Sequence, residues 1–269
     1  MVIDFHTHVF PDNIYKKAIA GMKEASGIDT YGDGSENGLI NDLKNGIIDK
    51  AVVLPVATKA NQVETINRYN ITKKYDNIYF LGAMHPDYMD FEKELKFLKD
   101  NGINGIKMHP EFQNFFFASD KKLYPMYETI LSLDMFIIFH SGYDEFVKHE
   151  INCINCSTPS IFAKVYNDFP NLKIVLAHCG GHNEFDIVKE HICGKNIYVD
   201  LSYDLAGSIS EKNLYELLNS HSEDFIIYGS DYPWQPLNGY YKYFDRLNIP
   251  SSKKEKIEYK NAEKLLGII

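Results

Sequence analysis

Two histidines stand at the end of the first apolar segment of the chain, as His6-Thr-His8. Residues i and i+2 of a β-strand share one face, so both imidazoles would point to the same side. So short a motif does not identify a site alone. Other apolar segments end in similar residues, namely His140 before Ser-Gly, His178 before Cys-Gly-Gly and Asp231 before Tyr-Pro. These five side chains are the candidates for shared chemistry.

Imidazole nitrogens and carboxylate oxygens together form a set of metal ligands. They suit zinc and also manganese, iron, cobalt or nickel. A single histidine is more often a hydrogen-bonded core residue, but five ionisable groups converging without a partner would be costly. We therefore expect a divalent metal, with zinc as the first expectation, if the fold brings the five side chains together.

Eight apolar segments rich in Val, Ile, Phe and Tyr recur along the chain. They are almost continuously apolar, which is typical of strands covered on both faces in a parallel sheet. The predicted strands are 2–8, 50–56, 78–84, 103–108, 135–140, 173–178, 197–201 and 224–229.

Segments with helical spacing separate these strands, for example from Phe91 to a stop at Gly102, or from the N-cap Thr158 with Pro159 at the first helical position. Eight alternations predict an α/β fold, a single (β/α)8 TIM barrel over residues 1–269. The open dinucleotide-binding sheet would need a glycine fingerprint after the first strand, and none is present there. The carboxyl ends of barrel strands form one rim, where the five candidates would meet.

Two connections are longer than usual, residues 9–49 and 141–158. The first contains a helical stretch over 14–25 and a glycine-rich piece. Both are candidate lids or substrate walls, and ordinary surface loops are an equal alternative. The chain ends in an amphipathic segment, 251–266, which we interpret as a helix that closes the barrel.

The composition excludes several classes of protein. Of 269 residues, 45% are hydrophobic and 24% charged, which is the usual globular balance. The net charge of −9 and the lack of a basic run argue against nucleic-acid binding. No apolar run approaches the ~20 residues that span a bilayer, and the first strand-like segment begins at Val2, so we expect no membrane span, no secretion signal and a cytoplasmic protein. Free thiols follow for the four cysteines.

The strand-end motifs together resemble the amidohydrolase superfamily, specifically its amidohydrolase 2 branch of metal-dependent hydrolases. The matching segments run in the family's order from residue 4 to about residue 234. They are Asp4-Phe-His6-Thr-His8, Gly105-Ile-Lys107-Met-His109-Pro, Phe139-His140-Ser-Gly, Ala177-His178-Cys-Gly-Gly and Tyr228-Gly-Ser-Asp231-Tyr-Pro. The resemblance implies that His6, His8, His140 and Asp231 bind the metal. It implies that His178 binds a second metal or contacts the water or the substrate.

A divalent metal lowers the pKa of a bound water from 15.7 to about 7. We therefore hypothesise that Asp231 accepts the proton of this water and passes it to the leaving group. His178 would polarise the substrate carbonyl. Lys107 and His109 would share an inward face of the fourth strand. In some members of the superfamily this lysine is carboxylated and bridges two metals; a contact of Lys107 or His109 with the substrate is the alternative that we favour, so one or two ions per chain are expected.

Several other residues are weaker candidates. His85 ends the third strand, Asp200 could support a ligand histidine, and Trp234 could form a pocket wall. Cys153-Ile-Asn-Cys156 has no second C-x-x-C, which argues against zinc. Three histidines, His149, His191 and His221, stand in polar contexts and are interpreted as surface residues.

Two activities are consistent with these motifs, each on a small-molecule substrate. The first is hydrolysis of an amide, lactone or ester; the second is non-oxidative decarboxylation of an aromatic or unsaturated acid. A planar carboxylate is typically held by an arginine fork, and the chain has only Arg68 and Arg246, neither at a strand end. Hydrolysis is therefore favoured. A third hypothesis, a non-enzymatic sensor that binds metal or ligand, is disfavoured, because a binding protein has no need of an open coordination position. A homo-oligomer is compatible with the sequence.

Overall fold

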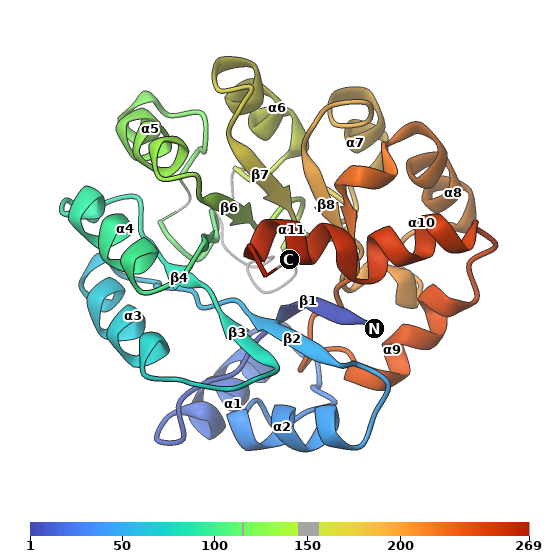
Figure 1. Ribbon diagram of the computed structural model, residues 1–269, viewed down its shortest axis with the longest axis horizontal. Helices are drawn as coiled ribbons and strands as arrows, with labels where there is room; N and C mark the ends of the chain where they lie inside the picture. The colour runs from blue at the N-terminus through green and yellow to red at the C-terminus, as the bar shows by residue number, and fades with distance from the viewer. Residues whose placement is uncertain (115, 145–155, 269) are drawn as a thin grey trace.

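The computed structural model describes residues 1–114, 116–144 and 156–268. Its centre is a ring of parallel strands, and the helices surround this ring (Figure 1). The strands are β1 (Ile3–Thr7), β2 (Lys50–Val53), β3 (Ile78–Phe80), β4 (Gly82–Ala83), β5 (Gly105–Met108), β6 (Phe136–Phe139), β7 (Lys173–Leu176), β8 (Tyr198–Asp200) and β9 (Ile226–Ile227).

The strands pair in sequence order and every pair is parallel, from β1 to β3 and from β4 to β9. The last and first strands also meet, because the Phe5 amide donates to the Tyr228 carbonyl at 3.0 Å and the Asp231 amide to the His6 carbonyl at 2.9 Å. These bonds close the ring. The predicted (β/α)8 barrel is therefore confirmed.

The third predicted strand, 78–84, is divided at Leu81 into β3 and β4. The Leu81 carbonyl accepts a hydrogen bond from the Asn70 side chain at 3.0 Å. The Asn67 side-chain amide donates to the Ala83 carbonyl and accepts from the Ala83 backbone amide. Side-chain amides of α3 (Val63–Ile71) therefore replace part of the strand ladder. The eighth predicted strand is also shorter than expected, since Glu223–Phe225 forms a 3₁₀ turn.

Helices follow the strands around the barrel. The long first connection holds two of them, α1 (Tyr15–Ser26) and α2 (Glu36–Lys44), and the predicted helical stretch 14–25 corresponds to α1. The remaining helices of the ring are α3, α4 (Phe91–Asp100), α5 (Tyr124–Ser132), α6 (Pro159–Asp168), α7 (Phe185–His191), α8 (Glu211–Ser220) and α9 (Leu237–Asp245). Short 3₁₀ turns lie at Ala60–Gln62, Lys121–Leu123 and Asp204–Ala206.

The predicted C-terminal helix over 251–266 forms as α10 (Ser251–Glu255), a π-helical turn (Lys256–Lys260) and α11 (Asn261–Leu266). This segment crosses one end of the barrel, near the N-terminus (Figure 1). Leu265 and Leu266 belong to the same apolar cluster as Ile3 and Phe5 of β1. The C-terminal segment therefore closes the amino end of the barrel with apolar side chains.

The barrel interior changes from apolar to polar along the strands. On β6, Phe136 and Ile138 lie in the interior cluster and His140 follows two positions later. The same alternation leads from Tyr198 to Asp200. On β1 the register against β2 shifts between Asp4 and Thr7. Such an irregularity re-aims side chains, so that Phe5 packs inside while His6 and His8 still reach the rim above it.

Two minor predictions have definite outcomes. His221 was expected at the surface, but it is buried, because it ends α8 where its Nε2 lies 2.9 Å from the Ile197 carbonyl, just before β8. Free thiols were expected at all four cysteines, and Cys179 and Cys193 are free. His149, Cys153 and most of the second long connection lie outside the described residues. Within the described chain, no helix combines the length and the apolar character needed to cross a bilayer.

Candidate metal centre and active site

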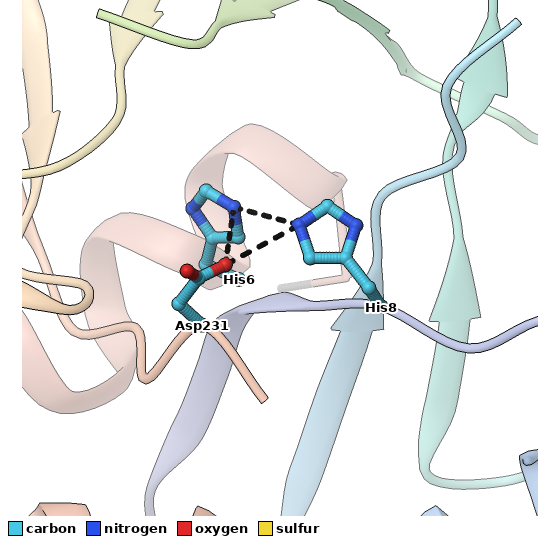
Figure 2. Close-up of side chains that lie close together, drawn as sticks. All are labelled: His6, His8 and Asp231. Atoms are coloured by element: carbon cyan, nitrogen blue, oxygen red, sulfur yellow. Dashed lines mark hydrogen bonds and ion pairs between the residues drawn. The ribbon is translucent and has the colours of Figure 1, made fainter. Parts of the chain in front are cut away.

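Three of the predicted ligands meet at the carboxyl ends of β1 and β9. The Nε2 atoms of His6 and His8 lie 3.1 Å apart, and Asp231 Oδ1 is 3.3 Å from the first and 3.4 Å from the second (Figure 2). His6 is fully buried, and the other two side chains are only slightly exposed. The three ligand atoms therefore form a nearly equilateral triangle.

The hydrogen bonds behind the two imidazoles decide which nitrogens carry protons. His8 Nδ1 lies 2.8 Å from the Leu54 carbonyl, which can only accept. His6 Nδ1 lies 2.8 Å from Asp200 Oδ2. Burial raises the pKa of Asp200, but the neighbouring His6 and hydrogen bonds outweigh burial and lower it overall, so this carboxylate also accepts. Both neutral imidazoles therefore keep the proton on Nδ1 and present a lone pair at Nε2.

This arrangement fits a divalent cation. A tetrahedral ion with metal–ligand distances of about 2.0–2.1 Å requires its ligand atoms to lie roughly 3.3–3.4 Å apart. Burial lowers the pKa of His8, which favours the neutral ligand form. Two nitrogen lone pairs and a carboxylate oxygen facing one another would repel without a cation between them. His6, His8 and Asp231 are thus the residues that would hold the ion.

Asp200 and Ser202 support this triangle from below. The Ser202 hydroxyl donates to Asp200 Oδ1 at 2.5 Å and lies 3.0 Å from His178 Nδ1 and 3.1 Å from His6 Nδ1. Asp200 therefore contacts His6, one of the predicted ligand histidines. Ser202 was not predicted, because a serine two residues after a strand has no distinctive sequence signal.

His178 and His140 lie beside the triangle. The Ser202 hydroxyl donates its hydrogen bond to Asp200 and therefore accepts one from His178 Nδ1. The other ring nitrogen of His178, Nε2, then carries a lone pair and lies 3.1 Å from His140 Nδ1. Burial lowers the pKa of both histidines well below the usual value. His140 Nε2 has no hydrogen-bond partner within the described part of the chain. A chain of hydrogen bonds therefore connects Asp200 to His140.

His140 belongs to a second group of ligand-type side chains rather than to the triangle. Asp144 Oδ2 lies 3.0 Å from His109 Nε2 and 3.7 Å from His140 Nε2, and all three residues are buried. The two imidazoles are stacked, with ring centroids 4.2 Å apart and planes 11° from parallel. The structure therefore divides the predicted ligand set. Asp144 was missed because it lies in a loop beyond the strand end, and His182, which pairs with Asp204 at 2.6 Å, was missed for the same reason.

Lys107 is fully buried on β5 and lines the same space. Burial lowers the pKa of its amine to about 8, although Asp200, Asp231, Asp144 and Glu111 all favour the charged form. Within the described residues its amine has no hydrogen-bonded or ion-paired partner. Lys107 therefore contributes an amine that loses its proton more readily than an exposed lysine but is still mostly protonated at pH 7.

A cavity of about 940 Å³ opens above these side chains, a size that suits a small-molecule ligand. Its inner end is formed by the triangle, His178, His140, Asp144, Lys107 and His109. Trp234 forms a wall and packs edge-on against His8, with ring centroids 5.4 Å apart. His85 is buried, but it is not among the residues that line this cavity.

The backbone is also unusual where the strands end. His178 has φ of 59° and Asp231 has φ of 74°, in the left-handed region that residues other than glycine rarely adopt. Such strained positions cluster at functional sites.

Comparison with known proteins places this site in a family. A family model described as Amidohydrolase (Amidohydro_2) matches residues 3–268. The chain belongs to the amidohydrolase family. The resemblance stated from the strand-end motifs is thereby confirmed, and with it an enzyme of the amidohydrolase superfamily whose His and Asp clusters suit a divalent metal.

Individual relatives are more distant. A dihydroorotase of Aliivibrio fischeri (strain MJ11) is 27% identical over 154 residues, which cover 54% of this chain and 44% of the relative. The chain thus matches less than half the length of that curated protein. A 2,6-dihydroxybenzoate decarboxylase from Rhizobium has a TM-score of 0.74 at 13% identity, covering 99% of this chain and 98% of its own.

A 5-carboxyvanillate decarboxylase from Novosphingobium aromaticivorans, solved in complex with manganese, has a TM-score of 0.72 at 15% identity and covers 99% of this chain and 96% of its own. At such low identities, the likeness to both decarboxylases concerns the fold.

Proposed function

We propose that this amidohydrolase-family protein is a metal-dependent hydrolase of a small-molecule amide, lactone or ester. The observation that carries the proposal is the triangle of His6, His8 and Asp231, whose ligand atoms lie 3.1–3.4 Å apart at the inner end of the cavity. A divalent ion bound there would supply Lewis-acid activation of a water molecule, with a pKa near 7 in known sites. Zinc is the ion that we propose.

Protein groups beside the ion would move the protons. Asp231 has one oxygen in the triangle, and we assign it the role of general base that later returns the proton to the leaving group. His178, which is linked through Ser202 to Asp200, would position or polarise the scissile carbonyl. Lys107, with a pKa near 8, would contact the substrate rather than bridge two ions.

The charges around the cavity favour a substrate without a carboxylate at the reacting centre. Arg68 is already paired with Glu94 through two hydrogen bonds of 2.8 and 3.0 Å, and Arg246 is exposed on the outside. Among the described residues that line the cavity, the cationic ones are Lys59 and Lys107. No arginine fork is therefore available here to hold a planar carboxylate.

Decarboxylation of an aromatic or unsaturated acid is the second candidate. The observation in its favour is the Lys107 amine, which could hold a carboxylate as a point charge. The two decarboxylases with the same fold agree with this alternative, and manganese rather than zinc would then be the natural ion to test.

One experiment separates the two activities. Metal-free protein is reloaded with zinc or with manganese and assayed against amides, lactones, esters and hydroxylated benzoic acids. Metal-dependent hydrolysis supports the proposal. Release of carbon dioxide from the acids without hydrolysis of the other compounds would replace it with the second candidate.

A further inference from the structure

Helix α1 differs from the other helices of the ring in what its apolar side contacts. Ser26 is its only buried residue, whereas α4 buries three side chains, Leu98 among them. Within the described chain, Ile14, Ala18 and Met22 belong to neither apolar core cluster. These three positions follow one another at a spacing of four, so they share one face of the helix. This face therefore serves something other than the packing of the barrel.

The same face lines two neighbouring spaces. Ile14, Ala18 and Met22 form part of the wall of the active-site cavity, which Val56 and Ile66 also line. They also line an adjacent groove of about 450 Å³, whose other lining residues are Lys17, Gly21, Ala25, Thr58 and Phe112. The groove therefore adjoins the cavity that ends at the metal triangle, and the two share these three residues as lining.

The lining of the groove indicates the chemistry of its occupant. Of its eight lining residues, Lys17 is charged and Thr58 is polar, and the other six are apolar or glycine. An apolar chain is stabilised there by the area that it removes from water, about 0.8 kcal/mol for each methylene. A strongly hydrated group would lose its water for few partners, since Lys17 and Thr58 are the polar residues among those that line the groove.

We propose that the groove along α1 binds an extended alkyl or acyl chain of the substrate while the scissile carbonyl lies at the His6, His8 and Asp231 triangle. This inference rests on the proposed hydrolase function and deepens it. The substrate class is an amide of an apolar acid or amine, or an ester of an apolar acid, with a chain several carbons long. The lining that the cavity and the groove share at Ile14, Ala18 and Met22, together with the mostly apolar lining of the groove, supports this occupant.

A binding experiment tests the groove without any need for turnover. Straight-chain alkyl hydroxamates, from acetohydroxamate to octanohydroxamate, carry a metal-binding head and tails of increasing length, and 1-alkanols from ethanol to octanol provide tails without that head. Their affinities for the zinc-loaded protein are measured by titration calorimetry. We expect the dissociation constant to fall about fourfold for each added methylene in both series.

Two matched variants on one helix locate the effect. Ala18→Phe fills the proposed groove, and Ala20→Phe adds the same ring on the exposed side of α1 outside both linings. Ala18→Phe should abolish the gain in affinity with chain length. Ala20→Phe should behave as wild type, and thermal melts verify that both variants fold.

The outcomes separate the groove from the catalytic proposal. An affinity that does not depend on chain length in wild type, or an equal gain in Ala18→Phe, would overturn the groove even if short esters are hydrolysed. A normal gain that Ala18→Phe removes would establish the groove even if no amide, lactone or ester is hydrolysed. Absence of hydrolysis would overturn only the hydrolase function.

Discussion

The two groups of histidines and carboxylates at the barrel rim have nearly the same composition but different geometry. In the first, the Nε2 lone pairs of His6 and His8 converge on Asp231, because Leu54 and Asp200 hold both Nδ1 protons on the far side. In the second, the imidazoles of His109 and His140 are stacked, and their Nε2 atoms both face Asp144. An imidazole binds a metal in the plane of its ring, so two parallel rings cannot both direct a lone pair at one ion. Orientation, not composition, distinguishes the candidate metal site that we propose from the second group.

The largest expected effect is loss of the ion from the first group but not from the second. His8→Ala should reduce bound zinc from about one ion per chain to almost none, and His109→Ala should retain it. Elemental analysis of both dialysed variants provides the measurement. His191→Gln, which removes a partly exposed imidazole from α7, is the control. Equal loss of zinc in His8→Ala and His109→Ala would show that the two groups form one centre.

Asp231→Asn separates metal binding from proton transfer within the first group. An amide oxygen can still face His6 and His8, but it cannot accept the proton of the attacking water. We expect the zinc content to be largely retained and kcat to fall by about 10²- to 10⁴-fold, the usual contribution of general acid–base catalysis. Steady-state kinetics on zinc-loaded protein measure this. Full turnover with bound zinc would exclude Asp231 as the base.

The sequence predicted the barrel and the rim because both depend on local pattern. His6, His8 and Asp231 end apolar segments, and the carboxyl ends of parallel strands meet wherever such a ring closes. Strand alternation does not explain how Phe5 and His6 can both serve the interior, which requires the register shift between Asp4 and Thr7. That shift depends on pairing with β2 and has no signal within the first strand.

The sequence could not divide the ligand set for a related reason. Asp144 and Ser202 lie past their strand ends, where the path of the loop decides what they contact. The path of the loop after β6 determines that Asp144 Oδ2 comes within 3.7 Å of His140 Nε2. The contact between His178 and Ser202 requires the ends of two neighbouring strands to lie side by side. Short hydrophilic segments carry no periodicity that would predict either contact.

Lys107 lies between the two groups, and its replacement measures how much its burial lowers the stability of the fold. Its pKa in the folded protein, about 8, is below the ordinary 10.5, so the unfolded chain binds more protons between these values. Stability of the metal-free protein should therefore rise with pH from about 8 to 10.5. Lys107→Met should stabilise it by about 3 kcal/mol at pH 7 and abolish that slope.

Urea unfolding of the metal-free variants at several pH values gives the measurement. Lys59→Met, on the exposed side of the cavity, is the control and should change stability by less than about 0.5 kcal/mol. A variant at Lys107 with unchanged stability and an unchanged slope would show that the amine is charged and well paired in the fold.

The smallest expected effect concerns the proton on His6. Asp200 Oδ1 accepts from the Ser202 hydroxyl and from the backbone amides of Ser202 and His178, at 2.5, 3.0 and 3.0 Å. In Asp200→Asn these three donors hold the amide oxygen in place, and the amide NH₂ must face His6 Nδ1. His6 can then accept that hydrogen only by moving its own proton to Nε2, which removes the metal-binding lone pair.

We expect Asp200→Asn to weaken zinc affinity by about 10- to 100-fold at neutral pH, the usual effect of altering the partner of a ligand histidine. Competition with a fluorescent chelator measures the dissociation constant. Asp204→Asn is the matched control, because Asp204 pairs with His182 at 2.6 Å in the same way but outside the triangle. If both variants bind zinc as tightly as the wild type, the far-side hydrogen bond does not set the His6 tautomer, and the distinction between the two groups would have to rest on ring orientation alone.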